Sequence, residues 1–319
     1  MSDAFIFPGQ GSQKLGMAAA FINGFKSGME VMEEIEEAIS FKISKLIAEG
    51  PIEELTKTEN AQPAIFSVGM SCVSILEKEY GYNIANNCKY VAGHSLGEYT
   101  ALCVAGVFSV LDAAKIIKKR GELMSESCPD NLEYSMMALI GVCAMEIEEL
   151  VKPYQSGRNI CVIANDNSLS QVVISGEKNT VKIVVERAKE LGATKAIELN
   201  TSGPFHSPLM AKAAIELDSF ISNNVTIHNF RVPIIMNSSA ELLNSSKEIH
   251  NYLIRQMTGR VRWRETIDFL RKDSEINRII EIAPGKVLSS MIKRSHPEVN
   301  VLNLETVSQI EEFIKIGQV

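Results

Sequence analysis

A glycine–serine pentapeptide between an apolar run and a helical pattern constrains the fold of this chain more than any other feature. Residues 89–92 lead directly into Gly93-His94-Ser95-Leu96-Gly97, and good helix formers follow from 98 to 105. In a nucleophile elbow the serine occupies a strained strand-to-helix turn, and glycines on both sides let the backbone turn without side-chain clash. The pattern therefore predicts an α/β architecture with Ser95 as a nucleophile. The structural alternative is a glycine-rich turn with a capping serine.

The start of the chain predicts a second loop at the same site. Residues 4–7 are apolar and stop at Pro8-Gly9-Gln10-Gly11, which indicates a buried strand that enters a tight loop. A serine that attacks a carbonyl group needs amide donors for the oxyanion that forms, and the helix after Ser95 makes the Leu96 N–H one such donor. The loop around Gln10 is the best candidate for the second donor, although a simple turn accounts for the same residues.

A nucleophilic serine requires a base, and the chain offers five histidines. His206 lies in the turn-rich segment 202–208, and loops hold site residues more often than core elements do. No acid follows it at an obvious partner position, so a neutral acceptor is expected to orient its ring in a dyad. His94 is expected to point away from the serine. The others lie in segments with a charged, surface-like composition or without a loop signal: His228, His250 and His296.

Arg120 allows two interpretations that periodicity does not separate. It stands in Lys118-Lys119-Arg120-Gly121, and by composition this is a basic, solvated helix face. Alternatively, one buried arginine grips a substrate carboxylate through two parallel hydrogen bonds.

The middle of the chain has a different element order from its flanks. Strands are expected at 135–142, 160–164, 171–175 and 195–199, with helices at 145–154 and 180–191 and Asn165-Asp166-Asn167 connecting two strands. This β-α-β-β-α-β order is ferredoxin-like. We therefore predict a small subdomain over residues 134–200, inserted into a large α/β domain formed by residues 1–133 and 201–319. In the large domain, residues 17–47 carry a helical pattern.

Composition excludes several functional classes. The chain has 319 residues, with 32 basic and 39 acidic side chains, and the net charge of −7 argues against general nucleic-acid binding. No run approaches the roughly 18 apolar residues of a membrane span, and the N-terminus lacks the features of a signal peptide. Six scattered cysteines without a C-x-x-C pair suggest reduced thiols in a cytoplasmic protein. No metal or other cofactor is expected.

Ordered motifs along nearly the whole chain resemble the malonyl-CoA:acyl-carrier-protein transacylase family of fatty acid synthesis. Together these motifs are far more specific than any one of them. They are Phe7-Pro8-Gly9-Gln10-Gly11-Ser12-Gln13, Gln62-Pro63-Ala64, Gly93-His94-Ser95-Leu96-Gly97-Glu98-Tyr99, Arg120-Gly121, Ile163-Ala164-Asn165-Asp166-Asn167, Gln171-Val172-Val173-Ile174-Ser175-Gly176, Pro204-Phe205-His206-Ser207, Arg255-Gln256 and Ala283-Pro284-Gly285-Lys286-Val287-Leu288.

The resemblance implies an α/β-hydrolase-like core with a ferredoxin-like insert, and a two-step reaction without a cofactor. Ser95, helped by His206, would attack the thioester of malonyl-CoA and form a malonyl-serine ester. The phosphopantetheine thiol of an acyl carrier protein would then take the malonyl group. Further roles implied by the family are oxyanion-hole amides for Gln10 and Leu96, a malonyl carboxylate partner for Arg120, a backbone carbonyl orienting the histidine for Gln256, and positions near the acyl pocket for Gln62, Met124 and Phe205.

Two positions depart from the family pattern. Glu133-Tyr134-Ser135-Met136-Met137-Ala138 stands where the family usually has a glycine-rich segment, which bears on the hinge and not on the chemistry. Phe205 is bulky, as in malonyl-selecting members, whereas many stand-alone bacterial members have a smaller residue.

Three functions remain open from the sequence. The same elbow serves lipases, esterases and peptidases, and Arg120 favours transfer of a carboxylated acyl group over them. The alternatives to fatty acid synthesis are a stand-alone acyltransferase serving a polyketide synthase and a non-catalytic carrier-protein-binding module.

An acidic carrier protein could dock on the basic C-terminal third, or that surface is an ordinary solvated face. Its basic residues are Arg255, Arg260, Arg262, Arg264, Lys286, Lys293 and Arg294.

Overall fold

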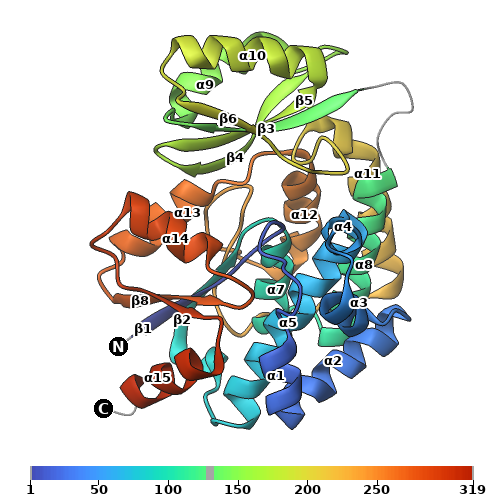
Figure 1. The fold of residues 1–319 in the computed structure, drawn as a ribbon, viewed down its shortest axis with the longest axis vertical. Helices are drawn as coiled ribbons and strands as arrows, with labels where there is room; N and C mark the ends of the chain where they lie inside the picture. The colour runs from blue at the N-terminus through green and yellow to red at the C-terminus, as the bar shows by residue number, and fades with distance from the viewer. Residues whose placement is uncertain (1, 127–132, 318–319) are drawn as a thin grey trace.

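The computed structural model describes residues 2–126 and 133–317, which form a mixed α/β structure with two separate sheets (Figure 1). The larger sheet is parallel and has the strand order β7-β2-β1-β8-β9. Its strands are β1 (Ser2–Phe7), β2 (Cys88–Gly93), β7 (Ile234–Ile235), β8 (Ile276–Ile282) and β9 (Val301–Leu304).

Helices cover both faces of the parallel sheet, as the alternation of side chains along a strand requires. Phe5 and Phe7 of β1 belong to one buried cluster with the helices of the first half of the chain. Ala4 and Ile6 point to the opposite face and pack with α13 and α14. The helices of this part are α1 (Ala19–Gly24), α2 (Lys26–Ile39), α3 (Ile43–Glu49), α4 (Ile52–Thr56), α5 (Thr58–Lys78), α6 (Ile84–Asn87), α7 (Leu96–Val104), α8 (Val110–Glu126), α11 (Ala211–Asn224), α12 (Ile249–Thr258), α13 (Trp263–Lys272), α14 (Val287–Ser295) and α15 (Val307–Gly317).

The second sheet is antiparallel and lies at one end of the long axis of the molecule (Figure 1). Its strand order is β4-β5-β3-β6, and two helices cover one face with a separate apolar core. The elements are β3 (Tyr134–Ile140), α9 (Ala144–Val151), β4 (Cys161–Ser168), β5 (Gln171–Glu177), α10 (Lys178–Glu190) and β6 (Lys195–Glu198). The predicted element order of this region is therefore confirmed.

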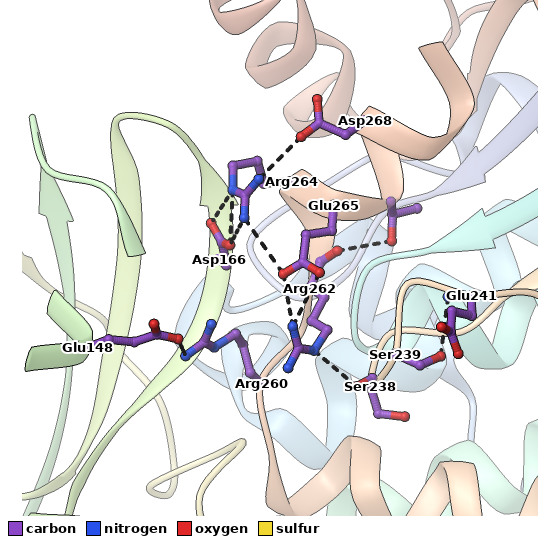
Figure 2. A network of polar contacts seen from close by, with 11 residues as sticks. Glu148, Asp166, Ser238, Ser239, Glu241, Arg260, Arg262, Arg264, Glu265 and Asp268 are labelled. Atoms are coloured by element: carbon purple, nitrogen blue, oxygen red, sulfur yellow. Dashed lines mark hydrogen bonds and ion pairs between the residues drawn. The ribbon is translucent and has the colours of Figure 1, made fainter. Parts of the chain in front are cut away.

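The two parts meet where β4 runs alongside the segment between α12 and α13. Asn165 forms a parallel bridge with Val261, and the Asp166 N–H donates to the Val261 carbonyl at 2.9 Å. The buried Asp166 carboxylate pairs with Arg264 at 2.9 Å, and Arg260 reaches Glu148 of α9 (Figure 2). The edge strand β4 of the small sheet is thereby fixed to the segment that follows Gln256.

Two local expectations are wrong. The helical pattern at 17–47 is divided into α1, α2 and α3, because the chain is extended at Phe25 and Ser40 takes a left-handed conformation with a φ of 51°. Asn165-Asp166-Asn167 is not a connection but the end of β4, since its polar side chains find partners across the junction, such as His94 and Arg264. Among the described helices, none is both long and apolar enough to span a membrane.

Candidate active site

Ser95 lies at the turn between β2 and α7, in a backbone conformation that L-amino acids rarely adopt. Its φ is 52° and its ψ is −104°, and such a conformation costs on the order of 1–3 kcal/mol. The turn is closed by direct contact of backbone on backbone. A Cβ on Gly93 would lie 2.0 Å from the Gly97 carbonyl, and a Cβ on Gly97 would lie 2.0 Å from the Phe7 carbonyl oxygen. The strained geometry of a nucleophile elbow is therefore present, with glycines where no side chain fits.

His206 contacts the Ser95 hydroxyl and is held by a backbone carbonyl. Its Nε2 lies 2.8 Å from Ser95 Oγ, and its Nδ1 lies 2.7 Å from the carbonyl oxygen of Gln256. A carbonyl only accepts, so Nδ1 carries the proton and Nε2 is free to accept from the serine. This arrangement is that of a Ser–His dyad oriented by a neutral acceptor. His206 also has a positive φ of 56°.

The imidazole is kept neutral by its surroundings. Only 3% of His206 is exposed, and burial, followed by the charge of Arg120, lowers its pKa to about 3. The carbonyl of Gln256 opposes this shift without cancelling it. The ring therefore remains in its basic form at neutral pH.

We expect a reaction in which His206 Nε2 takes the Ser95 proton to be insensitive to pH where a free histidine titrates. The rate constant for attack by the Ser95 hydroxyl should stay flat from about pH 8 to about pH 5, since an imidazole with a lowered pKa stays deprotonated over that range. The check is a single-turnover rate measured at each pH, with near-ultraviolet circular dichroism as a control for folding. A rate that halves near pH 6.5 would contradict the lowered pKa.

Arg120 is a buried cation that meets only neutral acceptors. It is 1% exposed, so the interpretation of this residue as part of a solvated helix face is wrong. Its Nη1 donates to Gln62 Oε1 at 2.7 Å, and its Nη2 donates to Gln256 Oε1 at 3.0 Å and to Ser95 Oγ at 3.2 Å. Among residues 2–126 and 133–317, Nε has no partner and no carboxylate forms an ion pair with this guanidinium. Burial lowers its pKa, yet an arginine remains charged at neutral pH. The arrangement is suited to an anionic ligand.

A cavity of about 270 Å³ joins most of the sequence-predicted site residues. Ser95, His206 and Arg120 lie in its wall, and the loop after β1 forms another side. Leu96 opens α7, so its N–H has no acceptor one turn back in the helix and is available to a ligand. The predicted residues that line the cavity are Ser95, Leu96, His206, Arg120, Gln10, Gln62, Met124 and Phe205; Gln256 lies behind them, fully buried.

The other histidines do not contact the serine. His94 Nε2 lies 2.8 Å from Asn167 Oδ1 of β4, so its ring links the elbow to the small sheet. His228 is exposed, and His250 pairs with Asp218. His296 is buried rather than surface-exposed, and its partner is Glu298.

Sequence reasoning missed two buried residues behind the elbow, Asn237 and Glu98. Asn237 Oδ1 accepts from the Ser95 N–H at 2.8 Å, and the Asn237 N–H donates to Glu98 Oε1 at 2.5 Å. Burial raises the pKa of Glu98 to about 8. A signal for Asn237 existed, because it directly follows the short apolar run 232–236 and polar residues at the carboxyl ends of parallel strands meet at one edge of the sheet. In the described part of the chain, no cluster of His, Cys, Asp or Glu could hold a metal ion.

The elbow and the serine–histidine pair suit acyl chemistry at a serine, which hydrolases and transferases share, and comparison with known proteins decides between the two classes. A family model described as an acyl transferase domain matches residues 4–313, so this chain belongs to the acyl transferase family. Among its relatives, the malonyl CoA-acyl carrier protein transacylase of Bacillus subtilis (strain 168) is 38% identical over 312 residues, which cover 98% of this chain and 96% of the relative. The transacylase of the same name from Staphylococcus aureus (strain MSSA476) is 33% identical over 308 residues, covering 97% of each chain.

Solved structures give the same result. The acyl-carrier-protein-S-malonyltransferase from Bartonella henselae superposes with a TM-score of 0.94 at 40% identity, covering 100% of both chains. A malonyl-transacylase solved in complex with a type II PKS acyl-carrier protein superposes with a TM-score of 0.92 at 31% identity, covering 99% of this chain and 100% of the other. The family expected from the sequence motifs is therefore confirmed.

Proposed function

We propose that this acyltransferase moves the malonyl group from malonyl-CoA to the phosphopantetheine thiol of an acyl carrier protein, and so supplies fatty acid synthesis. The observation that carries the proposal is the buried Arg120 guanidinium, 3.2 Å from Ser95 Oγ and without a carboxylate partner in the described chain. Relatives that cover nearly all of the chain bear the same activity in their names. The experiment compares the rates at which malonyl and acetyl groups are transferred from their coenzyme A esters to holo carrier protein. Equal rates would contradict the malonyl assignment.

In the first half-reaction Ser95 Oγ attacks the thioester carbonyl of malonyl-CoA while His206 Nε2 takes the hydroxyl proton. The carbonyl oxygen becomes an oxyanion, and the N–H groups of Leu96 and Gln10 are assigned to stabilise it. Collapse of this intermediate breaks the carbon–sulfur bond, and His206 returns its proton to the sulfur of coenzyme A. A malonyl-Ser95 ester remains.

The second half-reaction reverses these roles. The phosphopantetheine thiol attacks the ester carbonyl and gives its proton to His206, and the Ser95 oxygen leaves and recovers that proton. The Gln256 carbonyl, 2.7 Å from Nδ1, stabilises the imidazolium formed in each step without itself titrating. Gln62, Met124 and Phe205 are proposed to bound the acyl group, since all three line the cavity.

We propose the finer description of the fold on topological grounds. The strand order β4-β5-β3-β6 corresponds to 2-3-1-4 in chain order, which is the ferredoxin-like arrangement, and the elbow with its parallel sheet supports a hydrolase-like core. The proposed domains are 134–200 for the insert and 1–133 with 201–319 for the catalytic part.

We also propose that the protein works in the reducing cytoplasm, since its described cysteines are free thiols.

A second candidate, supply of malonyl groups to a polyketide synthase, has one specific observation in its favour. The similar malonyl-transacylase mentioned above was solved with a type II PKS acyl-carrier protein. The two pathways share the chemistry and differ in the carrier, so transfer rates to carriers of both kinds separate them. The non-catalytic module is disfavoured, because Ser95 and His206 lie within hydrogen-bonding distance and share one cavity with Arg120.

The basic docking surface becomes smaller once ion pairs are considered. Arg260, Arg262 and Arg264 each face a carboxylate, namely Glu148, Glu265 and Asp166 (Figure 2). These three charges are already paired within the protein, so they contribute little to the attraction of a partner. The remaining basic residues of that region are exposed and form no ion pair within the described chain: Arg255, Lys286, Lys293 and Arg294. We therefore restrict the proposed carrier-protein contact to these four.

Charge reversal at the end of α14 is expected to weaken the carrier-protein step alone. The variant with Lys293→Glu and Arg294→Glu should raise KM for the carrier protein about tenfold, because acidic carriers are steered by positive charge. Loading from malonyl-CoA should stay at the wild-type rate. The charge-matched control is Lys26→Glu with Lys45→Glu, on the exposed faces of α2 and α3. An equal KM in both double variants would argue against docking on α14.

A further inference from the structure

Asn237 is a buried residue that hydrogen-bonds to the backbone of the elbow. It follows β7, whose Ile234 and Ile235 pair in parallel with Val91 and Ala92 of β2. The pairing brings the ends of both strands to one level, so Asn237 lies beside Gly93 and Ser95. It is 0% exposed, and its backbone carbonyl accepts from the Arg262 N–H at 2.9 Å.

The amide of Asn237 continues the sheet beyond the last residue of β7. Its Nδ2 donates to the Gly93 carbonyl at 2.6 Å, while its Oδ1 accepts from the Ser95 N–H at 2.8 Å. Only an amide side chain carries a donor and an acceptor at this spacing. The Asn237 N–H is in turn tied to Glu98 Oε1, so the residue is anchored to the first turn of α7 as well.

The conformation of Ser95 depends on the two peptide planes that flank it. Asn237 holds the plane before it through the Ser95 N–H. Gln256 holds the plane after it, because its Nε2 donates to the Ser95 carbonyl at 2.6 Å. In a trans peptide the carbonyl and the next N–H point in opposite directions, so this second contact aims the Leu96 N–H away from Gln256. A strained φ of 52° persists only when neighbouring groups determine it in this way.

We infer that Asn237 is a positioning residue for acyl transfer, which locks the strained Ser95 backbone so that Oγ meets His206 and the Leu96 N–H meets the oxyanion. Asn237 is fully buried and does not line the cavity, so it acts through Ser95. It also occupies the Ser95 N–H, which leaves Leu96 as the elbow's oxyanion donor. The inference deepens the proposed acyl transfer and rests on it for its rate assay.

The first test compares Asn237→Ala and Asn237→Asp with the wild type. Asp keeps the size and the acceptor of Asn but loses the donor to Gly93. We expect the single-turnover rate of Ser95 malonylation to fall on the order of 100-fold in both, with KM for malonyl-CoA changed by less than about threefold. The matched control is Ser71→Ala, which removes a buried hydrogen bond to the Gly28 carbonyl between α5 and α2. It should cost similar stability and leave the rate unchanged.

A general loss of packing would not lower the rate while leaving KM unchanged. The comparison holds when the Asn237 variants and Ser71→Ala have the same melting temperature. A folded Asn237 variant that malonylates Ser95 within about threefold of the wild-type rate would overturn the inference. A second measurement needs no variant. The Ser95 amide proton in the wild type is expected to exchange as slowly as those of β2, and exchange at the rate of an exposed amide would equally overturn the inference.

Reactivity toward a sulfonyl fluoride separates this inference from the proposed function. The reagent modifies a serine activated by an adjacent histidine and does not need the malonyl group. If the wild type reacts with the sulfonyl fluoride but does not transfer malonyl, the proposed function fails, and the slower labelling expected for Asn237→Ala still tests the positioning role. Equal labelling of wild type and variant would refute that role.

Discussion

Replacement of Ser95 by alanine is expected to abolish malonyl transfer and the covalent intermediate together. The other site residues remain in place, so the variant should still bind malonyl-CoA. The loss in kcat should be on the order of 10⁴–10⁶-fold, as for other enzymes that lose a nucleophile activated by histidine. Intact-protein mass spectrometry after mixing with malonyl-CoA should show one malonyl adduct in the wild type and none in Ser95→Ala.

The companion variant His206→Ala tests whether the pair works as a unit. Ser95 Oγ and His206 Nε2 are 2.8 Å apart, and residues that act together give losses that do not add. The double variant should therefore be about as slow as either single variant. Two serines whose hydroxyls bond elsewhere are the controls, and both variants should retain activity. Ser125→Ala on α8 loses a hydrogen bond to Glu59, and Ser109→Ala before α8 loses one from the Asp112 N–H. An adduct on Ser95→Ala would show that another residue is the nucleophile.

The elements that carry the nucleophile could be predicted because their signals are local. An apolar run before Gly93 and helix formers after Gly97 are enough to indicate strand, turn and helix, and β2 and α7 lie there. The small sheet was likewise predictable, since its strands alternate with helices over short, regular intervals. The end of β4 was not predictable, because the burial of Asp166 depends on Arg264, almost a hundred residues away.

The electrostatic character of the site could not be predicted from the same patterns. Lys118, Lys119 and Arg120 are consecutive and equally polar, but only the third is turned inward by α8, beneath Gln62 of α5. The contact is a matter of helix packing, and no short-range pattern encodes it. For Asn237 the apolar run before it indicates only that a strand ends there, and its contact with the elbow depends on the pairing of that strand with β2.

Removal of the Arg120 charge is expected to change which acyl group is transferred. A buried charge deprived of its partner costs about 3–5 kcal/mol, so acetyl-CoA leaves Arg120 unsatisfied at a cost that malonyl-CoA avoids. In Arg120→Ala the kcat/KM for malonyl-CoA should fall about 10²–10³-fold, while that for acetyl-CoA should fall far less. Arg120→Lys should be intermediate, because a lysine keeps the charge but not the planar fork.

The ratio of the two substrates, rather than either rate alone, reports on recognition of the carboxylate. Arg120 also donates to Ser95 Oγ and to Gln256, so its loss disturbs the nucleophile for every acyl group, and that common effect cancels in the ratio. Lys119→Ala is the control, since it removes the neighbouring charge from the partly exposed side of α8. If Arg120→Ala slowed malonyl and acetyl transfer by the same factor, the guanidinium would serve to hold Ser95 and Gln256 in place, and malonyl selection would have to come from the shape of the cavity around Met124 and Phe205.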